Sequence, residues 1–198
     1  MKIGLIVKNE VIQKYELDEV KNLVNSNYEI TKIFSERKKL KKRNKFLNFI
    51  KNIYKNGFFA LIIIEQKIAG ILNNKHSFLK RIRDLQTKIN IFNKFPTLSK
   101  SKVYHFESKL IEKNFYGFSD EMIEIIRKEC DVIILLGYNK IIHKDYLKIA
   151  KEGILSFHTA NIKKYRGRPA GFHEFINNED FGGVTLQILE DKIDNGKI

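Results

Sequence analysis

The apolar residues near the start of the chain follow two different spacings. Residues 2–8 (KIGLIVK) form an almost continuous apolar run, which is typical of a buried strand. Residues 16–25 instead place their apolar side chains on one helical face, and residues 28–34 (YEITKIF) predict a second strand. The chain therefore opens with a β-α-β pattern, the beginning of a layered α/β fold.

The same alternation returns in the second half of the chain. It predicts strands at 102–106, 131–138, 154–158 and 183–189, and helices at 119–130 and 143–153. Ser119 is suited to cap the first of these helices, and Gly153 to end the second. Because strands alternate with helices, we expect an α/β fold with a Rossmann-like, open and mostly parallel sheet.

The middle of the chain, from about 36 to 100, interrupts this alternation. It begins with the charged block ERKKLKKRNK (36–45) and continues with helical spacing. We interpret this segment as a basic helical insertion within a single domain spanning 1–198. Its first part, 36–55, is expected to meet an anionic acceptor or surface, although a solvated charged helix explains the same pattern.

Composition narrows the class of protein further. The 198 residues are 43% hydrophobic and 30% charged, with one cysteine, Cys130, so no internal disulfide can form. The longest apolar run, at 58–64, is too short to span a membrane, and no signal peptide is visible. We therefore expect a cytoplasmic protein without a membrane span. The net charge of +14 comes mainly from lysine, so a dedicated nucleic-acid surface is not the expected explanation.

Four polar residues follow the predicted strands, where open α/β sheets bind their ligands. Asn139 follows the strand at 131–138, and Asp194 follows the last strand. Ser156 and His158 stand at the end of the strand at 154–158. A histidine, a carboxylate and two small hydrogen-bonding groups would thus converge from distant parts of the chain. Any one of them alone would be read as an ordinary loop residue.

Together, these segments resemble the 10-formyltetrahydrofolate-dependent formyltransferases. The resemblance is carried by GYNKII (137–142), G-x-x-S-x-H (153–158), YRG (165–167) and GVTLQILEDKIDNG (183–196). It covers residues 115–198 well, the opening strand weakly, and no motif between 36 and 100. Two departures stand out: Ser156 replaces the family's asparagine, and TANIK (159–163) replaces its usual loop after the histidine.

The resemblance implies a formyl donor, 10-formyltetrahydrofolate, and no metal. It implies catalytic roles for His158, Asp194 and Ser156, since formyl transfer needs proton removal from the amine and a donor for the developing oxyanion. The residues implied in donor binding are Gly137, Tyr138, Asn139, Lys140, Ile141, Ile142, Glu190, Asp191 and Ile193. Arg166 and Gly167 would lie near the acceptor.

The acceptor expected is a small, anionic molecule with a primary amine, and an amino-sugar nucleotide is the primary candidate. The alternatives are methionyl-tRNA formylation, formyltetrahydrofolate hydrolysis, and a non-catalytic relative that binds a partner. The sequence also suggests that the chain is a fragment, because it stops two residues after DNG (194–196). An exposed apolar groove beside the last strand is expected on that hypothesis. The sequence leaves the oligomeric state open.

Overall fold

A computed structural model gives the fold of residues 1–37, 84, 87–158, 160, 164–165, 172–180 and 182–191. Most of the predicted insertion, including all but the first two residues of its basic part, 36–55, lies outside these described residues. The elements of the first half are β1 (Lys2–Lys8), β2 (Val11–Gln13), η1 (Lys14–Glu16), α1 (Leu17–Asn25), β3 (Glu29–Glu36), β4 (Lys88–Asn90), α5 (Ile91–Lys94), η2 (Pro96–Lys100) and β5 (Lys102–Phe106). Those of the second half are β6 (Lys109–Glu112), β7 (Phe115–Gly117), α6 (Asp120–Glu129), β8 (Val132–Leu136), β9 (Ile141–Ile142), η3 (Lys144–Tyr146), β10 (Ile154–His158), α7 (Phe172–Ile176) and β11 (Thr185–Ile188).

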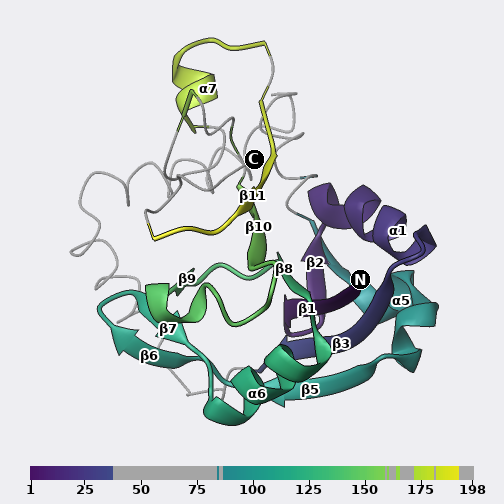
Figure 1. The fold of residues 1–198 in the computed structure, drawn as a ribbon. Coiled ribbons are helices and arrows are strands. Elements are labelled where there is room, and N and C mark those ends of the chain that lie inside the picture. Colours follow the sequence, from purple (N-terminus) through teal and green to yellow (C-terminus); the bar gives the residue numbers. More distant parts are fainter. Residues whose placement is uncertain are drawn as a thin grey trace, which may run out of the picture. The chain divides into compact units, whose positions relative to one another are not determined.

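The main sheet is mostly parallel, as the sequence predicts. Strands β5, β3, β1, β8 and β10 lie side by side in that order and all run parallel (Figure 1). β11 pairs with β10 in the antiparallel direction, and β2 and β4 extend the sheet from the end of β1. Strands β6, β7 and β9 form a second, three-stranded sheet. This arrangement is the α/β fold with an open parallel sheet expected from the alternation of elements.

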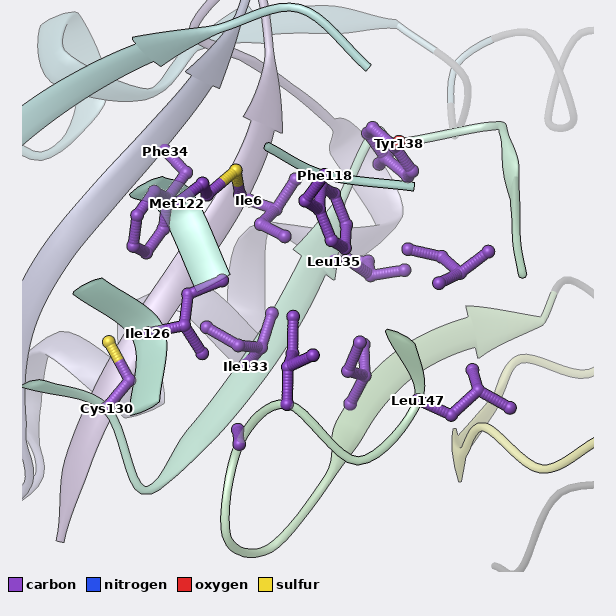
Figure 2. Packing of buried hydrophobic residues seen from close by; sticks show 14 of the residues in the cluster. Ile6, Phe34, Phe118, Met122, Ile126, Cys130, Ile133, Leu135, Tyr138 and Leu147 are labelled. Atoms are coloured by element: carbon purple, nitrogen blue, oxygen red, sulfur yellow. The ribbon is translucent and has the colours of Figure 1, made fainter. Parts of the chain in front are cut away.

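Alternating side chains of the parallel strands pack into two apolar clusters, one on each face of the main sheet. Ile133 and Leu135 of β8 pack with Met122 and Ile126 of α6 in the cluster drawn in Figure 2. The next residues along β8, such as Ile134, belong to the other cluster, which takes in residues of α1 and α5. All five residues of β8 are buried. This double burial explains why β8 reads as an uninterrupted apolar run.

The prediction of a helix at 143–153 is wrong. Only a 3-10 turn, η3, forms there, and turns follow it to Glu152. The reason is that Leu147 and Ile149 are both buried. Side chains two residues apart point to different sides of a helix, so a regular amphipathic helix could not bury both. Gly153 still ends the segment, with a φ of +87°.

The predicted insertion also ends earlier than the sequence suggested. Lys88–Asn90 form strand β4, which pairs with β2, and Pro96–Lys100 form a 3-10 helix. Asn90 caps α5, because its side chain accepts hydrogen bonds from the backbone N–H groups of Phe92 and Asn93, both at 3.0 Å. The residues from 87 onward are therefore part of the main α/β unit.

An apolar groove of about 620 Å³ lies against β11, beside the amino-terminal end of β1. Leu186 and Ile188 of β11 line it, and each exposes 38% of its surface. An exposed apolar groove was expected beside the last strand, and no finding tests the fragment hypothesis itself. That hypothesis stays a prediction.

Candidate active site

A cleft of about 830 Å³ opens at the carboxyl ends of the central parallel strands. Lys8, the last residue of β1, lines it, together with residues that end β8 and β10. The β6–β7 hairpin contributes a further part of its lining, through Glu112, Asn114, Phe115 and Tyr116. The carboxyl ends of parallel strands are where open α/β sheets bind ligands, so this cleft is the candidate active site.

The cleft brings together most of the residues predicted for the site. Those lining it are Tyr138, Asn139, Lys140, Ile141, Ile142, Ser156, His158, Glu190 and Asp191. Gly137 begins the same loop, and its φ of +60° makes it the turn residue at the end of β8. Arg166, Gly167, Ile193 and Asp194 lie outside the described residues.

Ser156 and His158 both belong to β10 and are two residues apart. Alternate residues of a strand point to the same side, so both side chains face the cleft. Their partners in β11 are Gln187 and Thr185, and the side chain of Thr185 donates a hydrogen bond to the carbonyl of Ala160 at 2.8 Å. Ser156 and His158 are both half-buried. A hydroxyl and an imidazole therefore stand together on rigid backbone in the cleft.

The loop from Gly137 to Ile142 is held by a buried carboxylate at the end of β3. Glu36 is 1% exposed and accepts hydrogen bonds from Lys140 and, at 2.7 Å, from the Ser108 hydroxyl. Ser108 in turn lies 2.7 Å from the Tyr138 hydroxyl, which must donate because the proton of Ser108 goes to Glu36. Burial raises the pKa of Tyr138 well above its usual range, so this hydroxyl keeps its proton. The Lys140 ammonium also lies 4.4 Å from the centre of the Tyr116 ring.

A second buried carboxyl group, that of Glu16, bonds the first residue of the same loop. Glu16, at the end of η1, is 2% exposed. It accepts hydrogen bonds from the backbone N–H of Gln13 at 2.7 Å and of Gly137 at 2.8 Å. Burial raises the pKa of Glu16 to about 7, although the two hydrogen bonds oppose this rise.

This raised pKa predicts a distinct pH dependence of stability. The folded state holds a proton on Glu16 up to about pH 7, whereas the unfolded chain releases it near 4.5. The resulting stabilisation is present below the unfolded pKa and is lost as pH rises through the folded one. Between pH 5 and pH 8, the free energy of unfolding should fall by about 2 to 3 kcal/mol more in the wild type than in Glu16→Gln.

Urea titration at the two pH values measures this difference. Asp18→Asn is the matched control, because Asp18 is an exposed acid on the adjoining helix α1 and should leave the wild-type slope unchanged. Equal pH slopes for the wild type and Glu16→Gln would contradict the prediction.

His143 lies at the rim of the cleft and was not predicted from the sequence. It is 6% exposed, and its Nε2 lies 3.4 Å from Glu112 Oε1. Its Nδ1 lies 3.4 Å from Asp145 Oδ2, and its ring packs edge-on against Phe115. His143 therefore connects η3 to the β6–β7 hairpin. Its sequence signal is weak, since a histidine next to two isoleucines in a turn is a common surface feature.

Lys8 and the two buried glutamates were also missed. For Lys8 a signal existed, because it ends β1 and so stands at the same sheet edge as the residues that were predicted. Its ammonium donates a hydrogen bond to Asn139 Oδ1 at 2.9 Å. Glu16 and Glu36 carried no local signal, because each contacts a loop more than 100 positions away.

The described residues contain no cluster of three or more histidine, cysteine, aspartate or glutamate side chains arranged to hold a metal ion. Within the same part of the chain, no helix is long and apolar enough to cross a membrane.

Comparison with known proteins places the chain in a family. A sequence model described as Formyl transferase matches residues 64–198. The chain therefore belongs to the formyl transferase family. The match begins within the segment 36–100, where the sequence shows no motif of the family.

Individual relatives agree with this assignment. A methionyl-tRNA formyltransferase of Wigglesworthia glossinidia brevipalpis is 26% identical over 142 residues, which cover 71% of this chain and 41% of that protein. The bifunctional polymyxin resistance protein ArnA of the same organism is 33% identical over 105 residues, covering 52% of this chain and 16% of that protein. The matches to the curated relatives thus span less than half of each relative's length.

The fold agrees with solved structures as well. A phosphoribosylglycinamide formyltransferase from Bacillus halodurans aligns over all of this chain and 76% of its own, with a TM-score of 0.55. The sequence identity is 11%, so this likeness supports the fold alone. It confirms the predicted fold class.

Proposed function

We propose that this protein transfers a formyl group from 10-formyltetrahydrofolate to an amine. The observation that carries the proposal is the juxtaposition of the Gly137–Ile142 loop with Ser156 and His158 in one cleft. These segments come from separate parts of the chain, and both were expected at the site from their resemblance to the family. The family match of residues 64–198 supports the same reaction class.

The cleft has the size and lining that a folate-type donor needs. Small-molecule sites typically measure about 300–1,000 Å³, and this cleft lies within that range. Apolar side chains, among them Leu135, Ile142 and Leu147, line it together with polar groups. When bound, the donor supplies the formyl carbon that the amine attacks. The residues proposed to hold it are those of the Gly137–Ile142 loop, with Glu190, Asp191 and Ile193.

His158 is proposed to take the proton that the attacking amine must lose. An imidazole exchanges protons near neutral pH and is therefore the usual choice for this step. Asp194 is proposed to orient that imidazole or a water molecule and to favour its charged form. Ser156 is proposed to donate a hydrogen bond to the formyl oxygen, in the place where the family uses an amide.

For the acceptor, the primary candidate is an amino-sugar nucleotide. A strongly basic chain is suited to an anionic acceptor, and the net charge is +14. Methionyl-tRNA is the second candidate, because many of the matched curated relatives are named methionyl-tRNA formyltransferases. Both candidates combine a primary amine with phosphate charge.

A formyl-transfer screen tests the proposal. The protein is incubated with 10-formyltetrahydrofolate and either amino-sugar nucleotides, glycinamide ribonucleotide or methionyl-tRNA, and formylated products are detected by mass spectrometry. We expect formylation of at least one amine and none without enzyme. Folate binding without transfer to any of these amines would contradict the catalytic proposal and favour the non-catalytic alternative.

Ser156→Ala should lower turnover, but by less than about 100-fold. The hydroxyl is one donor among several possible ones, and a water molecule can take its place. Steady-state kinetics with the acceptor found in the screen measures the effect. Ser99→Ala is the matched control, since Ser99 lies in η2, away from the cleft, and should leave turnover unchanged. A loss as large as that of His158→Ala would instead make Ser156 essential.

A further inference from the structure

Glu16 connects two segments that are 121 positions apart in the sequence. Its Oε2 accepts from the N–H of Gln13 and its Oε1 from the N–H of Gly137, at 2.7 Å and 2.8 Å. The residue is 2% exposed, although nothing in the proposed chemistry uses it. Burying a carboxyl group is costly unless it is hydrogen-bonded. The two backbone hydrogen bonds offset part of this cost.

The turn at Gly137 has no spare room. Gly137 has a φ of +60°, and a Cβ atom added there would lie 2.7 Å from the carbonyl oxygen of Val11 in β2. Strand β2 thus packs directly on the turn, and Glu16 is the last residue of η1, the short 3-10 helix that follows β2. The segment from Val11 to Glu16 therefore contacts the chain at the point where it leaves β8.

The rest of the loop is held through its side chains. Lys8 bonds Asn139 at 2.9 Å, and the buried Glu36 bonds Lys140. Glu16 differs from Lys8 and Glu36 because it accepts a hydrogen bond from a backbone N–H group of the loop. A hydrogen bond to the N–H of Gly137 fixes the plane of the peptide between Leu136 and Gly137. That plane determines where the following backbone groups of the loop point.

We propose that Glu16 is a positioning residue that sets the backbone conformation of the Gly137–Ile142 loop for donor binding. The inference rests on the proposed function, which assigns this loop to the folate donor. Glu16 itself does not touch the donor, since it is absent from the lining of the cleft. Its loss should therefore weaken donor binding and leave acceptor binding and the chemical step largely unchanged.

The test compares Glu16→Gln and Glu16→Ala with the wild type and with the control Asp18→Asn at pH 8. Titration with 5-formyltetrahydrofolate, a stable formylated folate, gives the donor Kd, and steady-state kinetics separates KM from kcat. Glu16→Ala should raise the donor Kd and KM about tenfold, the scale of one lost buried hydrogen bond. Glu16→Gln keeps one acceptor oxygen and should fall between Ala and wild type, while Asp18→Asn should match the wild type.

Gly137→Ala provides an independent variant if Glu16→Ala does not fold. Its added Cβ meets Val11 at the same turn, so it should also raise the donor Kd selectively. Unchanged donor Kd in Glu16→Gln and Gly137→Ala would overturn the inference, as would equal losses in donor KM and kcat. If the wild type itself binds no folate, the proposed function fails instead, and the two failures are thus distinguishable.

Discussion

Replacing His158 with alanine should lower formyl transfer at least about 100-fold while leaving folate binding intact. His158 is the last residue of β10 and faces the cleft beside Ser156. Its imidazole is the group proposed to remove the proton from the attacking amine. A water molecule in its place is a far weaker base, whereas the proposed donor loop, Gly137–Ile142, is unaffected. Turnover at saturating donor and acceptor measures the loss.

His105→Ala is the matched control, because His105 is an exposed histidine on β5 and should have no effect. Asp194→Asn should cost as much as His158→Ala, since the asparagine cannot stabilise a charged imidazole. This second expectation rests on the sequence resemblance, as Asp194 lies outside the described residues. Turnover of His158→Ala equal to that of the wild type would exclude His158 from the reaction.

Replacing Lys140 with methionine should lower the free energy of unfolding by about 3 kcal/mol. The Lys140 side chain is 12% exposed, and its partner Glu36 is 1% exposed. Without the ammonium, the Glu36 carboxylate would stay buried and would keep the hydrogen bond from the Ser108 hydroxyl, a weaker, uncharged donor. Removing one partner of a buried ion pair is costly mainly because the other charge stays behind. Urea denaturation of the two proteins measures the difference.

Two further variants identify the cause. Lys109→Met removes an exposed lysine from β6 and should change stability by less than about 0.5 kcal/mol. Adding Glu36→Gln to Lys140→Met should recover part of the loss, because the stranded charge is gone. A double variant that is less stable than Lys140→Met by the full cost of Glu36→Gln alone would contradict the ion-pair explanation.

The elements that the sequence predicted well are those whose burial is written in local spacing. Strand β8 is apolar at every position because both of its faces are covered, and α6 begins after the cap Ser119. The β6–β7 hairpin was missed because all four residues of β6 are exposed, including Leu110 and Ile111. Its turn signal, Asn114 with a φ of +72°, stands alone. No alternation of buried and exposed positions marks such a strand.

The residues of the candidate site also fall into a group that the sequence predicted and a group that it did not. Ser156, His158 and the 137–142 loop were found because polar residues after buried strands gather at one edge of a parallel sheet. The groups that hold this loop were not found, because their contacts are non-local. Glu36 reaches Lys140 across 104 positions and Glu16 reaches Gly137 across 121. The local sequence around a charged residue that adjoins an apolar run does not indicate which distant residue it will contact.

The central claim is that the cleft binds the formylated folate through the Gly137–Ile142 loop and the end of β10. Hydrogen-exchange mass spectrometry with and without saturating 5-formyltetrahydrofolate tests it most directly, because it locates the ligand without requiring the acceptor. The claim predicts slower hydrogen exchange in peptides covering 137–142 and 154–158. It predicts unchanged exchange in β5, which lies at the edge of the parallel strands away from β10. No binding, or protection confined to peptides outside the cleft, would contradict it.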